Sequence, residues 1–137
     1  MRPQSLREAV ERIMAGEEER LPISEFLDEF YMAVDCQTNN QPQQMIADEP
    51  PFTHKQPLDA YVGGIAEHLC RRWNLRIPPW VEDERRFLST PVWADDLQLM
   101  KPILLRDSPI AFRRRLIFTE AEPLRRGRFP VRQNLEL

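Results

Sequence analysis

The sequence predicts an all-α fold: a single compact domain of about five or six helices with proline-rich connections. Its 137 residues are enough for one hydrophobic core. Apolar residues recur every three or four positions in three separate segments, which is the spacing of one face of a helix. Thirteen prolines stand against four glycines, and proline removes backbone donors that a central strand needs. Long strands are therefore disfavoured.

The first predicted helix covers about residues 5 to 15. Ser5 is a suitable N-cap because Glu8 follows three residues later, the spacing of a capping box. Gly16 stands where a left-handed terminating residue is favoured. The residues that form the apolar face are Leu6, Ala9, Val10, Ile13 and Met14.

A second helix is predicted over about residues 22 to 34, because Pro22 suits a first turn and an apolar face follows it. The residues of that face are Ile23, Phe26, Leu27, Phe30, Tyr31 and Val34. Residues 36 to 57 are polar and interrupted by prolines, which is typical of a surface connection. They leave room for one short helix at about residues 43 to 48.

The third strong pattern predicts a helix over about residues 57 to 74, with Asn74 as its stop. Its apolar residues are Leu58, Tyr61, Val62, Ile65, Leu69 and Trp73. Gly63 and Gly64 fall inside this helix, and no phosphate-binding glycine motif surrounds them. We interpret the pair as a place where another element approaches the helix closely.

Shorter helices are predicted in the proline-rich second half. Residues 82 to 88 form one of them, and Asp95 or Asp96 caps another that carries Leu97, Met100, Ile103 and Leu104. Pro102 kinks the second of these helices unless it is short. A further one begins at Ser108-Pro109 and continues to about residue 117. The predicted domain covers residues 1–124, and residues 125–137, which lack a periodic apolar face, form a basic, flexible tail.

Charge is unevenly distributed along the chain, whose formal net charge is −3. Residues 1 to 35 hold four arginines and nine acidic residues, a net charge of −5, whereas residues 106 to 132 hold eight arginines and three acidic residues, a net charge of +5. Such asymmetry favours either a polyanion partner or pairing between the two regions, within the fold or across a dimer.

Two sets of arginines follow from this asymmetry. Arg113, Arg114 and Arg115 are candidates for contacting a protein partner. Because they end a short helix, their pairing with the helix dipole and with acidic residues, within the fold or across a dimer, is favoured over nucleic-acid binding. The nucleic-acid alternative places phosphate contacts on the arginine-rich C-terminal segment, at Arg125, Arg126 and Arg128 together with the 113–115 triplet.

Two tryptophans stand in rigid, proline-containing segments, Trp80 after Pro78-Pro79 and Trp93 after Pro91. Proline lowers the ordering cost of a binding loop and tryptophan often anchors interfaces, so both are candidate partner-binding residues. They suit equally well a lid over the helical core, with the indole N–H bonded to a loop carbonyl.

No catalytic or metal-binding signature is present. Cys36 and Cys70 lie far apart and are expected to be reduced thiols. His54 and His68 lack the partners of a known motif, so an enzyme would need an unfamiliar site built around His68 and nearby acids. We expect no catalytic residues, no metal and no cofactor.

The chain also contains no apolar stretch of the roughly 18 residues that a membrane span requires, and no signal-peptide pattern at its start. A cytoplasmic protein without membrane contact is the expectation.

Several residue strings between about residues 23 and 118 resemble a group of small bacterial helical proteins of uncharacterised function, similar to antitoxin-like companion proteins of toxin–antitoxin and other two-gene systems. These strings are Phe26-Leu27-Asp28-Glu29-Phe30-Tyr31, Leu58-Asp59-Ala60-Tyr61, Ala66-Glu67-His68-Leu69, Pro79-Trp80-Val81, Arg86-Phe87-Leu88, Pro91-Val92-Trp93, Ser108-Pro109 and Ala111-Phe112-Arg113-Arg114-Arg115. The resemblance implies binding rather than catalysis. Our hypothesis is a non-enzymatic interaction module whose partner is another protein or a second copy of itself.

Overall fold

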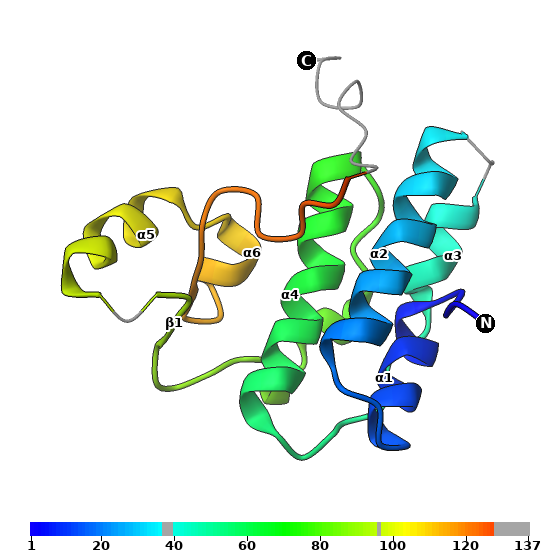
Figure 1. The fold of residues 1–137 in the computed structure, drawn as a ribbon, viewed down its shortest axis with the longest axis horizontal. Helices are drawn as coiled ribbons and strands as arrows, with labels where there is room; N and C mark the ends of the chain where they lie inside the picture. Colours follow the sequence, from blue (N-terminus) through cyan, green and yellow to red (C-terminus); the bar gives the residue numbers. More distant parts are fainter. Residues whose placement is uncertain (37–39, 96, 128–137) are drawn as a thin grey trace.

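A computed structural model describes residues 1–36, 40–95 and 97–127, and over these ranges the chain is mostly helical (Figure 1), which confirms the predicted all-α class. The α-helices are α1 (Leu6–Met14), α2 (Arg20–Asp35), α3 (Gln41–Ala47), α4 (Gln56–Trp73), α5 (Lys101–Asp107) and α6 (Ile110–Arg113). Three 3₁₀ turns are η1 (Pro79–Glu82), η2 (Glu84–Arg86) and η3 (Gln98–Met100). The strands β1 (Val92–Trp93) and β2 (Ile117–Phe118) complete the described elements.

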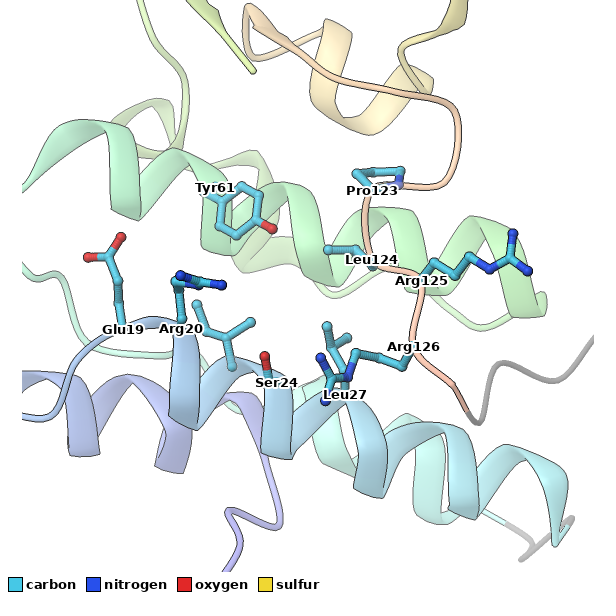
Figure 2. Close-up of a pocket in the computed structure, with 10 residues that line it drawn as sticks. Glu19, Arg20, Ser24, Leu27, Tyr61, Pro123, Leu124, Arg125 and Arg126 are labelled. Atoms are coloured by element: carbon cyan, nitrogen blue, oxygen red, sulfur yellow. The ribbon is translucent and has the colours of Figure 1, made fainter. Parts of the chain in front are cut away.

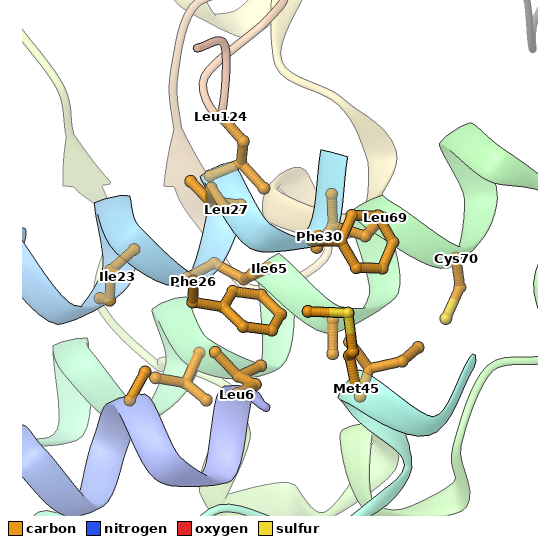
Figure 3. Packing of buried hydrophobic residues seen from close by; sticks show 14 of the residues in the cluster. Leu6, Ile23, Phe26, Leu27, Phe30, Met45, Ile65, Leu69, Cys70 and Leu124 are labelled. Carbon is orange, nitrogen blue, oxygen red and sulfur yellow. The ribbon is translucent and has the colours of Figure 1, made fainter. Parts of the chain in front are cut away.

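The hydrophobic core lies among α1 to α4, and α2 packs against both α1 and α3. Figure 3 shows Phe26 and Phe30 of α2 among side chains of the three other helices. Those neighbours include Leu6, Met45, Ile65 and Leu69, all buried. Burying one such side chain contributes about 1.5–3 kcal/mol, so the regular apolar spacing of these helices is what drives their association.

The ends of the long helices follow the signals in the sequence. Ser5 Oγ accepts a hydrogen bond from the Glu8 backbone N–H at 3.1 Å and caps α1. Gly16 takes φ = 114°, a backbone conformation that glycine adopts without steric cost. Asn74 ends α4 in the left-handed conformation with φ = 58°, which asparagine tolerates better than most residues.

The second half of the chain is less helical than predicted. Residues 82 to 88 form no α-helix: Glu82 ends η1, and η2 covers only Glu84–Arg86. The helix expected from Asp95 or Asp96 begins only at Lys101, with η3 in front of it. Pro102 lies in the first turn of α5, where a backbone N–H would have no acceptor within the helix. Proline is therefore tolerated there, and it starts the helix instead of kinking it. The proposed cap Asp96 lies outside the described residues.

The helix expected from Ser108-Pro109 to residue 117 ends early, because Leu116 adopts φ = 63° and turns the chain into β2. β2 pairs in parallel with β1, in the register Val92 to Ile117 and Trp93 to Phe118. Strands of two residues are too short for alternation to appear in the sequence. The pairing nevertheless joins two segments on either side of α5 and α6.

Within the described ranges, none of the helices combines the length and the apolar character needed to cross a membrane.

Gly63 and Gly64 make room for the C-terminal half, as the sequence indicates. An added Cβ at Gly64 would lie 2.6 Å from Cε1 of Phe112, and one at Gly63 would lie 3.1 Å from both Arg115 Nε and Arg86 Cβ. The glycine pair therefore lets α6 and η2 approach the backbone of α4.

Gly64→Ala is expected to destabilise the fold. Alanine gains about 1 kcal/mol of helix propensity over glycine, but overpacking against a buried ring costs about 1–3 kcal/mol, and a 2.6 Å contact with Phe112 belongs at or above the upper end of that range. The net loss should be about 2 kcal/mol in the free energy of unfolding, measured by urea denaturation. Gly127→Ala, where nothing lies within 4 Å of the added Cβ, is the control. Equal midpoints for the two variants would contradict the close packing.

Candidate functional site

Glu67 is the centre of a buried ionic cluster between α4 and the C-terminal half. Its side chain is fully buried, yet its carboxylate accepts hydrogen bonds from Arg115 at 2.6 Å, Arg114 at 2.7 Å and Arg71 at 2.7 Å. Arg115 is also fully buried and donates to the carbonyls of Ala111 and Val81 at 2.7 and 2.6 Å. This arrangement satisfies most of the polar atoms that burial removes from water.

The charges of the cluster are set by these contacts. Burial alone would raise the pKa of Glu67, but the hydrogen bonds from Arg115, Arg71 and Arg114 outweigh it and hold that pKa below its ordinary value. Burial in turn lowers the pKa of Arg115, although Glu67 acts in the opposite direction. The carboxylate is therefore ionised at neutral pH and fully engaged by its arginines.

A second buried arginine, Arg86, anchors η2. It donates to the Pro50 carbonyl at 2.6 Å, lies 3.5 Å from the exposed Glu49 carboxylate, and stacks 4.0 Å from the centre of the Phe52 ring. Carbonyl and aromatic contacts offset part of the cost of burying its charge. Sequence reasoning did not identify Arg86 or Glu67 as buried, because both residue types are normally exposed.

The three arginines proposed for partner binding, Arg113 to Arg115, differ in their burial and in their partners. Arg115 lies inside the core, and Arg114 bridges Glu67 and Glu82, the latter at 2.8 Å. Arg113 is exposed and donates to the Ser108 carbonyl at 2.8 Å. Pairing within the fold therefore describes Arg114 and Arg115, whose carboxylate partners are Glu67 and Glu82. Arg113 remains the candidate for contact with a partner.

Both tryptophans are half-buried. The indole N–H of Trp80 donates to the Ile46 carbonyl at 3.2 Å while the ring packs against the core, which is the geometry of a lid. Trp93 stacks on Phe118 with ring centres 4.5 Å apart, and Lys101 Nζ lies 5.1 Å from its ring centre. Trp80 thus covers α3, and Trp93 covers one face of the small sheet.

The segment proposed for nucleic-acid contact begins on the body of the domain. Tyr31 donates its hydroxyl proton to the Leu124 carbonyl at 2.7 Å, and Arg126 contacts both oxygens of Asp28, at 2.9 and 3.2 Å. Arg125 is exposed. Arg128, and the rest of the predicted tail beyond residue 127, lie outside the described residues.

His68 and Cys70, on the buried side of α4, face apolar surroundings. Burial, followed by the charge of Arg72, lowers the pKa of His68 to about 4, and burial raises the pKa of the Cys70 thiol to about 12. His68 lies beside the Phe112 ring, with centres 5.7 Å apart. In the described ranges, no three or more histidine, cysteine or carboxylate side chains gather as a metal site would require. His68, the residue around which an enzyme site was considered, is thus engaged in packing, and the nearby acid Glu67 is engaged by arginines.

The most unusual surface is an apolar arm, which we define as residues 97–110. Figure 1 shows α5 at the opposite end of the molecule from α1 and α3, and α5 packs mainly against η3. Leu99 is 87% exposed and Leu97 is 64% exposed, and Leu104 is the single buried residue of α5. The other exposed apolar residues of the arm are Ile103, Leu105 and Ile110. Apolar side chains gathered in one segment indicate an interaction surface more strongly than scattered ones do.

An apolar groove, the Tyr61 groove, adjoins the arm. It comprises a hollow of about 500 Å³ and a second of about 280 Å³ that share Tyr61, Val92 and Ile117. Its lining includes Val92 of β1 and Ile117 of β2. Ala94 and Thr119, which directly follow the two strands, line it as well, together with Met100 and Leu104. Among the described residues, the charged side chains of its lining are all acidic: Glu19, Asp95 and Glu120.

Tyr61 also borders a third hollow, of about 190 Å³, between α2 and α4. Figure 2 shows Tyr61 across this hollow from Arg20 and Ser24, with Pro123 to Arg126 along one side. Burial raises the pKa of Tyr61, so its hydroxyl stays protonated at neutral pH and is a hydrogen-bond donor.

Sequence reasoning missed both the arm and the groove. The arm does carry a signal: Leu97, Leu99, Met100, Ile103, Leu104 and Leu105 are too many apolar residues for one helix face, so some must be exposed. The groove carries none, because it is formed by segments that are far apart in the sequence.

Comparisons of the chain with protein-family models, with curated proteins and with solved structures found no match. Function is therefore inferred from the surfaces described above.

Glu67→Ala is expected to destabilise the fold by about 3–5 kcal/mol, because it leaves Arg115 charged and buried without its partner. Urea denaturation measures the loss. Glu82→Ala, which removes a half-exposed partner of Arg114, should cost less than about 1 kcal/mol. The double variant Glu67→Ala/Arg115→Met should be more stable than Glu67→Ala alone, and a double variant that is less stable would contradict the pairing.

Stability should also fall with acidification because of His68. Its pKa is about 4 in the fold and about 6.5 in an unfolded chain, so the unfolded state binds the proton first as pH falls from 6.5 towards 4. The free energy of unfolding should decrease by up to about 1.4 kcal/mol per pH unit in this window. Denaturation at pH 7, 6 and 5 measures the slope. His68→Leu should flatten it, while His54→Asn should retain it; equal slopes in all three proteins would exclude His68 as the cause.

Proposed function

We propose that this protein is a non-enzymatic protein–protein interaction module whose contact surface is the apolar arm. The observation that carries the proposal is the exposure of five large apolar side chains within one short segment at the end of the molecule. Covering such side chains in an interface contributes about 25 cal/mol per Å² of apolar area removed from water.

The buried chemistry supports binding over catalysis. Glu67 is engaged by three arginines and His68 is kept neutral among apolar groups, so neither is disposed for proton transfer to a substrate. Lys101, within the arm, is half-exposed, and Arg113, which follows the arm, is exposed; both add positive charge to this surface. An aromatic anchor, Trp93, lies at its base.

The strings that resemble antitoxin-like companion proteins support the same class, in which a small helical protein acts by binding its partner chain. A cytoplasmic location is part of this proposal. The nucleic-acid alternative has less support, because Arg126 already contacts both oxygens of Asp28.

The proposal is tested by affinity capture from a lysate of the protein's own cells. Wild-type bait should retain a binding protein, whereas Leu99→Glu/Leu105→Glu bait should lose it. Met14→Glu, which places the same charge on a half-exposed apolar residue of α1, should retain it. Circular dichroism confirms that all three baits are folded. Identical capture by wild-type and arm-variant baits, or a wild-type bait that retains neither another protein nor an untagged copy of this chain, would refute the role of the arm.

A further inference from the structure

We propose that the partner of the apolar arm is a second copy of this chain, with the arm of each copy docked in the Tyr61 groove of the other. This inference rests on the proposed function and names its partner.

The arm and the groove are chemically complementary. The arm presents exposed leucine and isoleucine side chains, and the groove is lined by Val92, Ala94, Ile117 and other apolar groups. The larger hollow, about 500 Å³, is within the size range of protein pockets that bury most of a bound group. Apolar anchors and an apolar receptor are thus present on the same molecule.

Charge favours the same pairing. The arm holds Lys101, Arg106 and Asp107, a net charge of +1. Arg106 contacts Asp107 at 2.7 Å, so the net positive charge of the arm is that of Lys101. The charged residues that line the groove in the described part of the chain are acidic. An apolar segment with a net positive charge is therefore the occupant that the groove attracts, and the arm is such a segment.

The positions of the arm and the groove permit twofold symmetry. The two adjoin, because Met100 and Leu104 line the groove while Leu99, Ile103 and Leu105 are exposed. One twofold axis beside α5 can therefore form both arm-to-groove contacts at once. This is the isologous arrangement that most homodimers adopt.

Sedimentation equilibrium of the purified full chain tests the proposal. Wild type should be dimeric in the micromolar range, and Leu99→Glu, which alters the arm, should raise the dimer dissociation constant at least about tenfold. Ala94→Arg should do the same, because it places positive charge on an exposed groove residue. Ala15→Arg, at an exposed alanine after α1, should leave the constant unchanged.

Mixing the two variants gives the decisive measurement. Each variant alone loses both symmetric contacts. A heterodimer keeps one native contact, and in the other it brings the acid introduced by Leu99→Glu beside the base introduced by Ala94→Arg, an attractive pair. The mixture should therefore dimerise more tightly than either variant alone. Failure of the mixture to do so would overturn the assigned contact.

Two further outcomes separate this inference from the proposed function. A wild-type chain that stays monomeric up to about 100 µM, while capture of a different protein still depends on Leu99 and Leu105, overturns the second copy as partner but leaves the arm as an interaction surface. A dimer that neither Leu99→Glu nor Ala94→Arg weakens overturns the arm-to-groove contact itself.

Discussion

The buried contact between Glu67 and Arg115 joins the two halves of this fold. α1 to α4 form the apolar core, and the C-terminal third is attached to α4 through this pair, the neighbouring Arg114, and the ring of Phe112. Removing two charges from water costs several kcal/mol per ion unless hydrogen bonds compensate for the lost hydration. The fold supplies them with two backbone carbonyls and two more arginines, and it needs Gly63 and Gly64 to bring these groups close enough.

The same anchoring explains why the arm is exposed. β1 precedes the arm and β2 follows it, and the two strands pair side by side in parallel. Ser108 connects the end of the arm to the segment after β2: its hydroxyl donates to the Leu104 carbonyl at 2.6 Å and accepts from the Thr119 N–H at 2.9 Å. The chain between the strands is thus fixed at both ends while most of its middle lies off the core. An exposed apolar segment held on a rigid base is suited to binding, because little conformational entropy remains to be lost on contact.

The long helices could be predicted because their apolar residues repeat over many turns and their ends carry local signals. Ser5, Gly16 and Asn74 each act within one turn of the chain, and α1, α2 and α4 begin and end close to the predicted positions. The glycine pair of α4 could also be interpreted, since a glycine inside a helix indicates a close neighbour.

The ionic cluster and the groove could not be predicted, because both depend on contacts between distant segments. A buried glutamate does leave one trace: apolar and small residues occupy almost every position of α4 from Leu58 to Cys70, so Glu67 lies in a stretch that is buried on most sides. Which arginines would meet it depends on the path of the chain after residue 74. The two-residue strands and the 3₁₀ turns that set this path are too short to produce a periodic pattern.

Glu67 and Arg115 lie 48 positions apart in the chain, so they are synthesised at different times. A ribosome that adds about 5–20 residues per second completes α4, with Glu67 and Arg71, several seconds before Arg114 and Arg115 are made. Until then the Glu67 carboxylate has to remain hydrated, so the newly made N-terminal portion exposes a charged, hydrated surface along α4. The Glu67 carboxylate can therefore lose its water only after Arg114 and Arg115 have been made and can pack against α4.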